Sequence, residues 1–189
     1  MEDMNKNHRY RMVQLATMAM MTAISSVLIM LITVPFPLFP DFRYDLADVP
    51  ILITAFSFGP VSGLIVTAIA SAIQAFALGQ AGLMGFMMHM GATGIFVIVA
   101  GCIYKHHKTK HAALLGLVLG TLAMTVLMCI LNLVLDPIFW GTPREAVLRL
   151  LVPAIIPFNL SKAGINSLIT FLIYKRVSKL IHRAEDRSR

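Results

Sequence analysis

The chain of 189 residues is 58% hydrophobic and only 13% charged, with a mean hydropathy of +0.79. This composition excludes a soluble enzyme and predicts an integral membrane protein, since soluble domains carry about a quarter charged residues. The net charge of +7 does not indicate a nucleic-acid partner, because the basic residues are confined to short segments between long apolar stretches.

The positions of the charges predict the orientation of the chain in the membrane. Most Lys and Arg residues fall into three clusters, at 6–11, 105–110 and 175–189. Basic segments stay on the cytoplasmic side, so both termini are predicted to be cytoplasmic. Five acidic residues lie in the two long intervening loops, which then face outward: Asp41, Asp45, Asp48, Asp136 and Glu145.

The first predicted span covers residues 12–34 and is longer than the apolar region of a signal peptide, which favours an anchor. A proline-rich segment at 35–40 closes it, because proline rings cannot continue a helix. Breaks at 57–60 and 79–82 divide the next apolar stretch into 46–58, 61–78 and 83–104. Two further spans are predicted at 112–135 and 153–174, separated by a loop at 136–151.

The segment 46–58 is short for a span, since 13 helical residues cover only about 20 Å of a hydrocarbon core of about 30 Å. Residues 46–78 could therefore form one kinked span. That alternative would place the basic segment 105–110 outside, whereas two spans keep all three basic clusters inside. We therefore predict an all-α membrane protein of six transmembrane helices, with a single membrane domain filling residues 1–189.

Polar residues inside the predicted spans are the candidates for function, because burying unpaired polar groups in hydrocarbon is costly. Asn159, Lys162 and Asn166 follow the spacing i, i+3, i+7 and share one helical face. Lys162 lies about eight residues inside its span. A ligand or an internal polar network is expected to hold it, and snorkelling to the membrane surface is the alternative.

Asn132 and Asp136 form a second polar face at i, i+4, for which a structural interhelical hydrogen bond is the alternative. Asn132, Asn159 and Lys162 all lie in the outer halves of their spans. Amides and an ammonium there suit a neutral ligand rich in carbonyl, imide and hydroxyl groups, and not a phosphate. If Lys162 is charged, Asp136 is the nearby counter-charge that the sequence offers.

The remaining polar residues and motifs give weaker signals. His89 and Gln74 are predicted to be satisfied core groups. Cys102 and Cys129 lack metal-ligand spacing, so no metal site is predicted. Catalytic and nucleotide-binding motifs are missing from the sequence, which predicts a protein that is not an enzyme, needs no cofactor, and cannot itself use ATP to drive uptake.

Several motifs together resemble a known family. The small-residue pair Ala19-x-x-x-Ala23, the segment YDLADVP at 44–50 and the segment FGPVSG at 58–63 resemble the substrate-binding S components of energy-coupling factor (ECF) vitamin transporters, over essentially the whole chain. The segment PFNLSK at 157–162, with Asn132 and Asn166, is most similar to the riboflavin-specific members of that family.

The resemblance implies a multi-pass protein of the bacterial plasma membrane that binds riboflavin from outside. Its implied partners are membrane lipid, a transmembrane coupling protein and two cytoplasmic ATPases. By the same resemblance, Asn132, Asn159 and Lys162 contact the flavin, with Asn166 and Asp136 beside them. The loop at 36–44, including Leu38 and Phe39, covers the ligand, and Ala19 and Ala23 face the coupling protein.

Three alternatives stay open at this point. The first is a stand-alone secondary transporter, which would favour paired halves with broken helices. The second is an S component for another vitamin. The third is a structural membrane protein without a ligand, which would leave the polar face of Asn159, Lys162 and Asn166 unexplained.

Overall fold

The computed structural model describes residues 2–37 and 39–187, with side chains at 8–37 and 42–181. Most of the described chain is helical, and two short strands interrupt it. The elements in chain order are α1 (Glu2–Leu31), β1 (Thr33–Phe36), β2 (Phe39–Asp45), α2 (Asp48–Phe58), α3 (Pro60–Ala72), the π-helical turn η1 (Ile73–Ala77), α4 (Gly82–His106), α5 (Lys110–Trp140), α6 (Arg144–Leu150), the π-helical turn η2 (Leu151–Ile155) and α7 (Ile156–Arg187).

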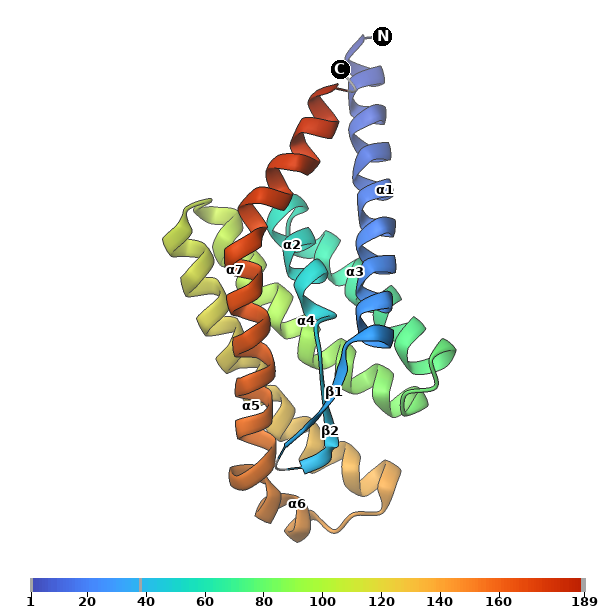
Figure 1. The fold of residues 1–189 in the computed structure, drawn as a ribbon, viewed down its shortest axis with the longest axis vertical. Helices are drawn as coiled ribbons and strands as arrows, with labels where there is room; N and C mark the ends of the chain where they lie inside the picture. The colour runs from blue at the N-terminus through green and yellow to red at the C-terminus, as the bar shows by residue number, and fades with distance from the viewer. Residues whose placement is uncertain (1, 38, 188–189) are drawn as a thin grey trace.

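The long helices run alternately up and down in one bundle, with both chain ends at the top of Figure 1 and the β-hairpin and α6 at the bottom. Five segments of the described chain are long and apolar enough to cross a membrane: His8–Leu31, Pro60–Ala77, Gly82–His106, Lys110–Trp140 and Arg144–Ile181. The helix α2 is apolar but shorter. The structure is thus that of a helical membrane protein.

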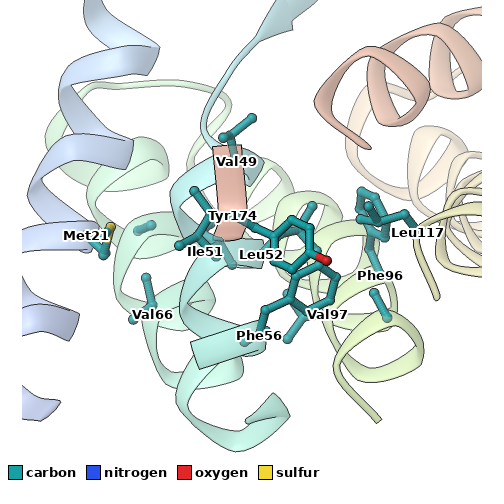
Figure 2. Close-up of a cluster of buried hydrophobic side chains, with 14 of the residues drawn as sticks. Met21, Val49, Ile51, Leu52, Phe56, Val66, Phe96, Val97, Leu117 and Tyr174 are labelled. Carbon is teal, nitrogen blue, oxygen red and sulfur yellow. The ribbon is translucent and has the colours of Figure 1, made fainter. Parts of the chain in front are cut away.

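The short helix α2 lies at the centre of the bundle. Its residues from Asp48 to Phe56 are all buried, and it contacts α1, α3, α4 and α7. Figure 2 shows Ile51 and Leu52 of α2 among the buried side chains of these helices, including Val66 and Tyr174. Burial on all sides by other helices explains why eleven residues suffice here.

Glycines set the helix boundaries and the closest helix packing. Gly59 has φ 97°, a value that L-residues rarely adopt, and Pro60 follows it in the first turn of α3. Together they separate α2 from α3. Gly120 faces Phe96, and a Cβ built on it would lie 2.5 Å from that ring. Gly120 therefore permits the close approach of α4 and α5.

The prediction of an all-α protein holds for the helical bundle, but residues 33–45, predicted as the end of the first span and an outer loop, form two short strands. The helix α1 ends at Leu31, and β1 pairs antiparallel with β2, with Thr33 opposite Asp45 and Val34 opposite Tyr44. The β-branched run Ile32, Thr33 and Val34 favours extended backbone, and the prolines after it prevent a helix.

The predicted outer loop at 136–151 is largely helical. The helix α5 continues through Pro137 to Trp140, and Gly141, in the left-handed conformation, ends it. The short helix α6 and the turn η2 then lead into α7. The helix packs Val147, which is 1% exposed, against the bundle, while Leu148 and Val152 stay exposed on its outer side.

Candidate functional site

A cavity of about 580 Å³ opens between the hairpin, the connection from α3 to α4, and the helices α5 and α7. Its volume lies within the roughly 300–1,000 Å³ of small-molecule sites. The cavity is lined by Thr33, Phe42, Arg43, Asp45, Gln74, Leu78, Gly79, Gln80, Ala81, Gly85, Met88, His89, Ala92, Thr93, Met124, Met128, Phe158, Asn159 and Lys162. The lining combines polar groups with apolar side chains, a mixture that can hold an amphipathic molecule.

A buried ion pair forms part of the cavity wall. Lys162 Nζ of α7 lies 2.8 Å from Asp45 Oδ2 of β2, and the backbone N–H of Ala47 donates to the other oxygen of the carboxylate over 3.1 Å. The predicted counter-charge, Asp136, was therefore wrong. Asp45 belongs to a segment predicted as an outward-facing loop, and no local pattern of residues indicates that this segment folds back onto α7.

The surroundings of Asp45 keep its carboxylate charged. Burial alone would raise its pKa, but the charge of Lys162 and the hydrogen bonds from Lys162 and Ala47 hold the pKa below the ordinary value. Because the ammonium of Lys162 is compensated by this carboxylate, the lysine can border a cavity that takes an uncharged ligand.

A second buried carboxylate, Asp48 at the start of α2, lies beside the first. It accepts a hydrogen bond from Thr93 Oγ1 of α4 over 2.7 Å and another from Asn166 Nδ2 of α7 over 2.9 Å. His89 Nε2 of α4 is 3.8 Å from its Oδ1. Asp48 is 0% exposed, so these polar partners replace the water that it has lost.

Asn166 connects the hairpin to this network. Its amide also donates to the backbone carbonyl of Asp45 over 3.2 Å, and it accepts from the Tyr44 hydroxyl over 3.0 Å. Burial, together with the charges of Asp45 and Asp48, raises the pKa of Tyr44 to about 12. Asn166 was predicted beside the ligand, but its amide groups are engaged beneath the cavity, and it is not among the described lining residues.

Of the other predicted site residues, Asn159 lines the cavity next to Lys162, with its amide donating to the carbonyl of Ile155 over 2.8 Å. Asn132 donates to the carbonyl of Met128 over 2.6 Å. It lies one turn beyond Met128, which lines the cavity, and is not itself among the described lining residues. Asp136 is partly buried on the same helix and likewise does not line it.

The predicted covering loop is the hairpin. Phe42 of β2 packs on Phe158 of α7 with ring centroids 4.9 Å apart, and Phe36 of β1 meets the same ring at 5.5 Å. Leu38 lies outside the described residues, and for Phe39 only the backbone in β2 is described. The hairpin thus reaches across the cavity to α7.

The sequence prediction missed the polar residues on the far side of the cavity, which are Gln74, Gln80 and His89. The prediction that Gln74 and His89 are satisfied core groups is wrong for one atom of each, because Gln74 Oε1 and His89 Nε2 have no hydrogen-bond partner among the described residues. The sequence does contain a pattern that could have identified these residues. All three lie close to the glycine-rich break at 79–82, and polar side chains grouped at the adjoining ends of two spans indicate a shared site.

Ala19 and Ala23 are exposed on the outer face of α1, and Met18 and Thr22 on the opposite face are buried. The side chains of Ala19 and Ala23 therefore do not pack inside the bundle. A patch of small exposed side chains permits another helix to approach closely.

The comparisons with known proteins agree with this architecture. The family model described as "ECF transporter, substrate-specific component" matches residues 13–174. The chain belongs to this family. Such S components are substrate-binding parts of transporters and not enzymes, and membership sets aside the stand-alone secondary transporter and the structural protein without a ligand.

Similar S components are known by sequence and by structure. The riboflavin transporter RibU of Staphylococcus aureus (strain TCH60) is 32% identical over 191 residues, covering 95% of this chain and 100% of that protein. The riboflavin transporter FmnP of Bacillus subtilis (strain 168) is 31% identical, covering 90% of this chain and 94% of that protein. A solved structure titled "Structure and mechanism of the S component of a bacterial ECF transporter" has a TM-score of 0.73 at 32% identity, covering 89% of this chain and 96% of that one.

Proposed function

We propose that this S component binds riboflavin from outside the bacterial plasma membrane and delivers it to an ATP-driven ECF transporter. The observation that carries the proposal is the match, over almost the full length of both chains, to relatives named as riboflavin transporters. The cavity provides the physical basis, because its size and mixed lining suit a flavin.

The side of the cavity formed by α5 and α7 suits the flavin ring. Met124, Met128 and Phe158 supply an apolar wall for the fused rings, and Asn159 and Lys162 lie at its edge. The uracil-like edge of the ring alternates acceptors with a donor, which an amide and an ammonium can match. Asn132, one turn beyond Met128, is the next polar group along the same face of α5.

We propose that the chain crosses the membrane six times and that both termini lie in the cytoplasm. Both chain ends lie at one end of the bundle and the hairpin at the other (Figure 1). Basic clusters follow α4 and flank both termini, which puts that end in the cytoplasm. The cavity, bordered by the hairpin, then opens toward the outside, and α2 counts as the second crossing despite its length.

Uptake requires partners. We propose that Ala19 and Ala23 on the exposed face of α1 receive a transmembrane coupling protein, which two cytoplasmic ATPases drive. The sequence contains no phosphate-binding glycine-rich motif, so the energy has to come from other subunits.

Titration with riboflavin tests the binding proposal. The protein is purified in detergent, stripped of flavin by mild denaturation and refolding, and titrated while the quenching of flavin fluorescence is followed. We expect saturable one-site binding that ATP does not change. Biotin and thiamine, as competitors, should not displace the flavin. A protein that quenches no riboflavin fluorescence, or that prefers another vitamin, contradicts the proposal.

A further inference from the structure

A second hollow, of about 280 Å³, lies on the surface of the bundle between α5 and α7, and it shares no lining residue with the cavity proposed for riboflavin. In Figure 1 the start of α5 lies at the left of the bundle, beside the upper half of α7. Residues of both helices line the hollow, among them Leu114, Val118 and Leu122 of α5 and Gly164, Leu168 and Phe171 of α7. The four leucine and valine side chains in this set are exposed on two membrane-spanning helices, so this α5–α7 groove faces the lipid.

The α5–α7 groove lies in the half of the membrane next to the cytoplasm, in the orientation proposed above. Leu114 and Leu122 lie within the first thirteen residues of α5, about 6 and 18 Å along the axis from its first residue. The basic segment 105–110 leads into α5 at its cytoplasmic end. Since one leaflet contributes about 15 Å of hydrocarbon, the groove lies at the depth of the acyl chains of the cytoplasmic leaflet.

The lining of the groove suits hydrocarbon. Its two polar side chains, Thr121 of α5 and Ser167 of α7, are 3.1 Å apart and hydrogen-bond to each other, which lowers their need for a polar partner in the occupant. One turn of a helix, about 10 Å wide and 5.4 Å long, fills about 400 Å³, more than the 280 Å³ of the groove. A hydrocarbon chain therefore fits the groove better than an embedded helix does.

Gly164 has no packing role that explains it. A Cβ built on it would meet no described atom within 4 Å, whereas on Gly116 and Gly120 of α5 it would lie 3.0 and 2.5 Å from atoms of α4. Gly164 is also not among the glycines with positive φ. Glycine inside a helix is destabilising relative to alanine. The open space that Gly164 leaves in the wall of the groove is the feature that distinguishes it from the packing glycines.

Lysines continue the groove toward the cytoplasm. Lys175 lies one turn beyond Phe171 on the same face of α7, and Lys179 lies one turn further; both are exposed. The sequence has no acidic residue between 49 and 135 or between 146 and 184, so no carboxylate of these helical segments offsets the two charges. Lysines next to the membrane surface attract anionic lipid headgroups.

We propose that the α5–α7 groove binds an anionic phospholipid of the cytoplasmic leaflet, with one acyl chain between α5 and α7 and the headgroup at Lys175 and Lys179. This lipid site goes beyond the proposed riboflavin binding and depends only on the orientation proposed for the bundle. A lipid that binds the folded chain and not the unfolded chain also stabilises the fold.

Lipid titration of the full chain tests the site. The protein is freed of lipid in detergent and titrated with phosphatidylglycerol, or with phosphatidylcholine of the same acyl chains, while native mass spectrometry counts the lipids bound. Wild-type protein should bind phosphatidylglycerol about tenfold more tightly. Gly164→Leu should weaken the binding of both lipids about tenfold, because the new side chain occupies the space of the acyl chain. Gly164→Ala, which adds only a methyl group, is the matched control and should bind as the wild type does.

The headgroup contact has its own matched pair of variants. Lys175→Gln should reduce the preference for phosphatidylglycerol about fivefold. Arg176→Gln removes one charge from the next position, about 100° around the helix, and should leave the preference unchanged. Riboflavin fluorescence quenching reports that each variant is folded and should match the wild type.

Three results overturn the lipid site: equal affinity of the wild-type protein for the two lipids, wild-type lipid binding by Gly164→Leu, or equal effects of Lys175→Gln and Arg176→Gln. If Gly164→Leu keeps its lipid but loses uptake in the presence of the coupling protein, the groove receives a protein helix and the lipid proposal is wrong. If the wild-type protein shows the expected lipid preference and binds no riboflavin, the proposed function fails and the lipid site stands.

Discussion

Asp45 and Lys162 are 117 positions apart in the chain, and their side chains form a buried ion pair with a distance of 2.8 Å. The pair joins the end of β2 to the second turn of α7. It fixes the base of the hairpin and borders the cavity at the same time, so a single contact links the cover of the site to the helix that carries its polar face.

Removing one partner of this pair should destabilise the protein more than removing both. Lys162→Met leaves the Asp45 carboxylate buried without its cation, which costs about 3–5 kcal/mol. The double variant Asp45→Asn with Lys162→Met should recover a large part of that loss. Thermal unfolding in detergent measures both, with the exposed Lys110→Met as control. Additive losses in the double variant would show that the two side chains act independently.

The Asp45–Lys162 pair makes the stability of the protein depend on pH, and the pKa of Asp45 determines the direction of the change. The pKa of Asp45 is held below its ordinary 3.8, so the folded state binds the proton more weakly than the unfolded state does. The stabilisation is complete above pH 3.8 and is lost as the pH falls through the lowered value. Stability measured between pH 7 and 3 should therefore decline less steeply below pH 4 in Asp45→Asn. Parallel curves would contradict the pairing.

The role of α7 in ligand binding can be tested with one variant on its polar, buried face and a control variant on its exposed face. Asn159→Ala should weaken riboflavin binding by about 1–3 kcal/mol, the usual cost of an unsatisfied buried partner. Asn159 is 1% exposed and lines the cavity, whereas Ser161, two residues on, is exposed. Ser161→Ala should bind with wild-type affinity. If the two variants bind alike, the ring-binding assignment is wrong.

The sequence predicted the helical segments well, because apolar length and basic clusters follow directly from the bilayer. It also placed Asn159 and Lys162 on one face, since helical periodicity determines which side chains share a face. Both residues line the cavity.

Contacts between distant segments could not be predicted in this way. The pairing of Asp45 with Lys162 depends on a hairpin whose two strands have few residues and no clear alternation of polar and apolar side chains. The role of Asp48 was missed for the same reason. A carboxylate beside prolines indicates a solvated loop unless the partner that buries it is known, and here those partners, Thr93 and Asn166, come from α4 and α7.

The hairpin should respond to ligand at its tip and not at its base. The base is anchored by Asp45 and by the Tyr44 hydroxyl, whereas nearer the tip Phe36 and Phe42 contact Phe158 through ring packing. Riboflavin should slow amide hydrogen exchange in residues 36–42 and change it little at 44–46. Peptide-resolved exchange with and without flavin measures this. Equal exchange at the tip in both states indicates a static cover.

The exposed face of α1 should serve docking and not binding. Ala19 and Ala23 lie one turn apart with both side chains exposed, so bulky replacements there leave the interior packing undisturbed and obstruct a helix that slides against them. The double variant Ala19→Trp with Ala23→Trp should bind riboflavin as the wild type does. It should fail to support uptake in vesicles that contain the coupling protein, both ATPases and ATP. Val126→Trp, at a position of α5 that is 61% exposed, is the control for added bulk on another surface and should leave uptake intact. Normal uptake by the double variant would place the coupling surface elsewhere on the bundle.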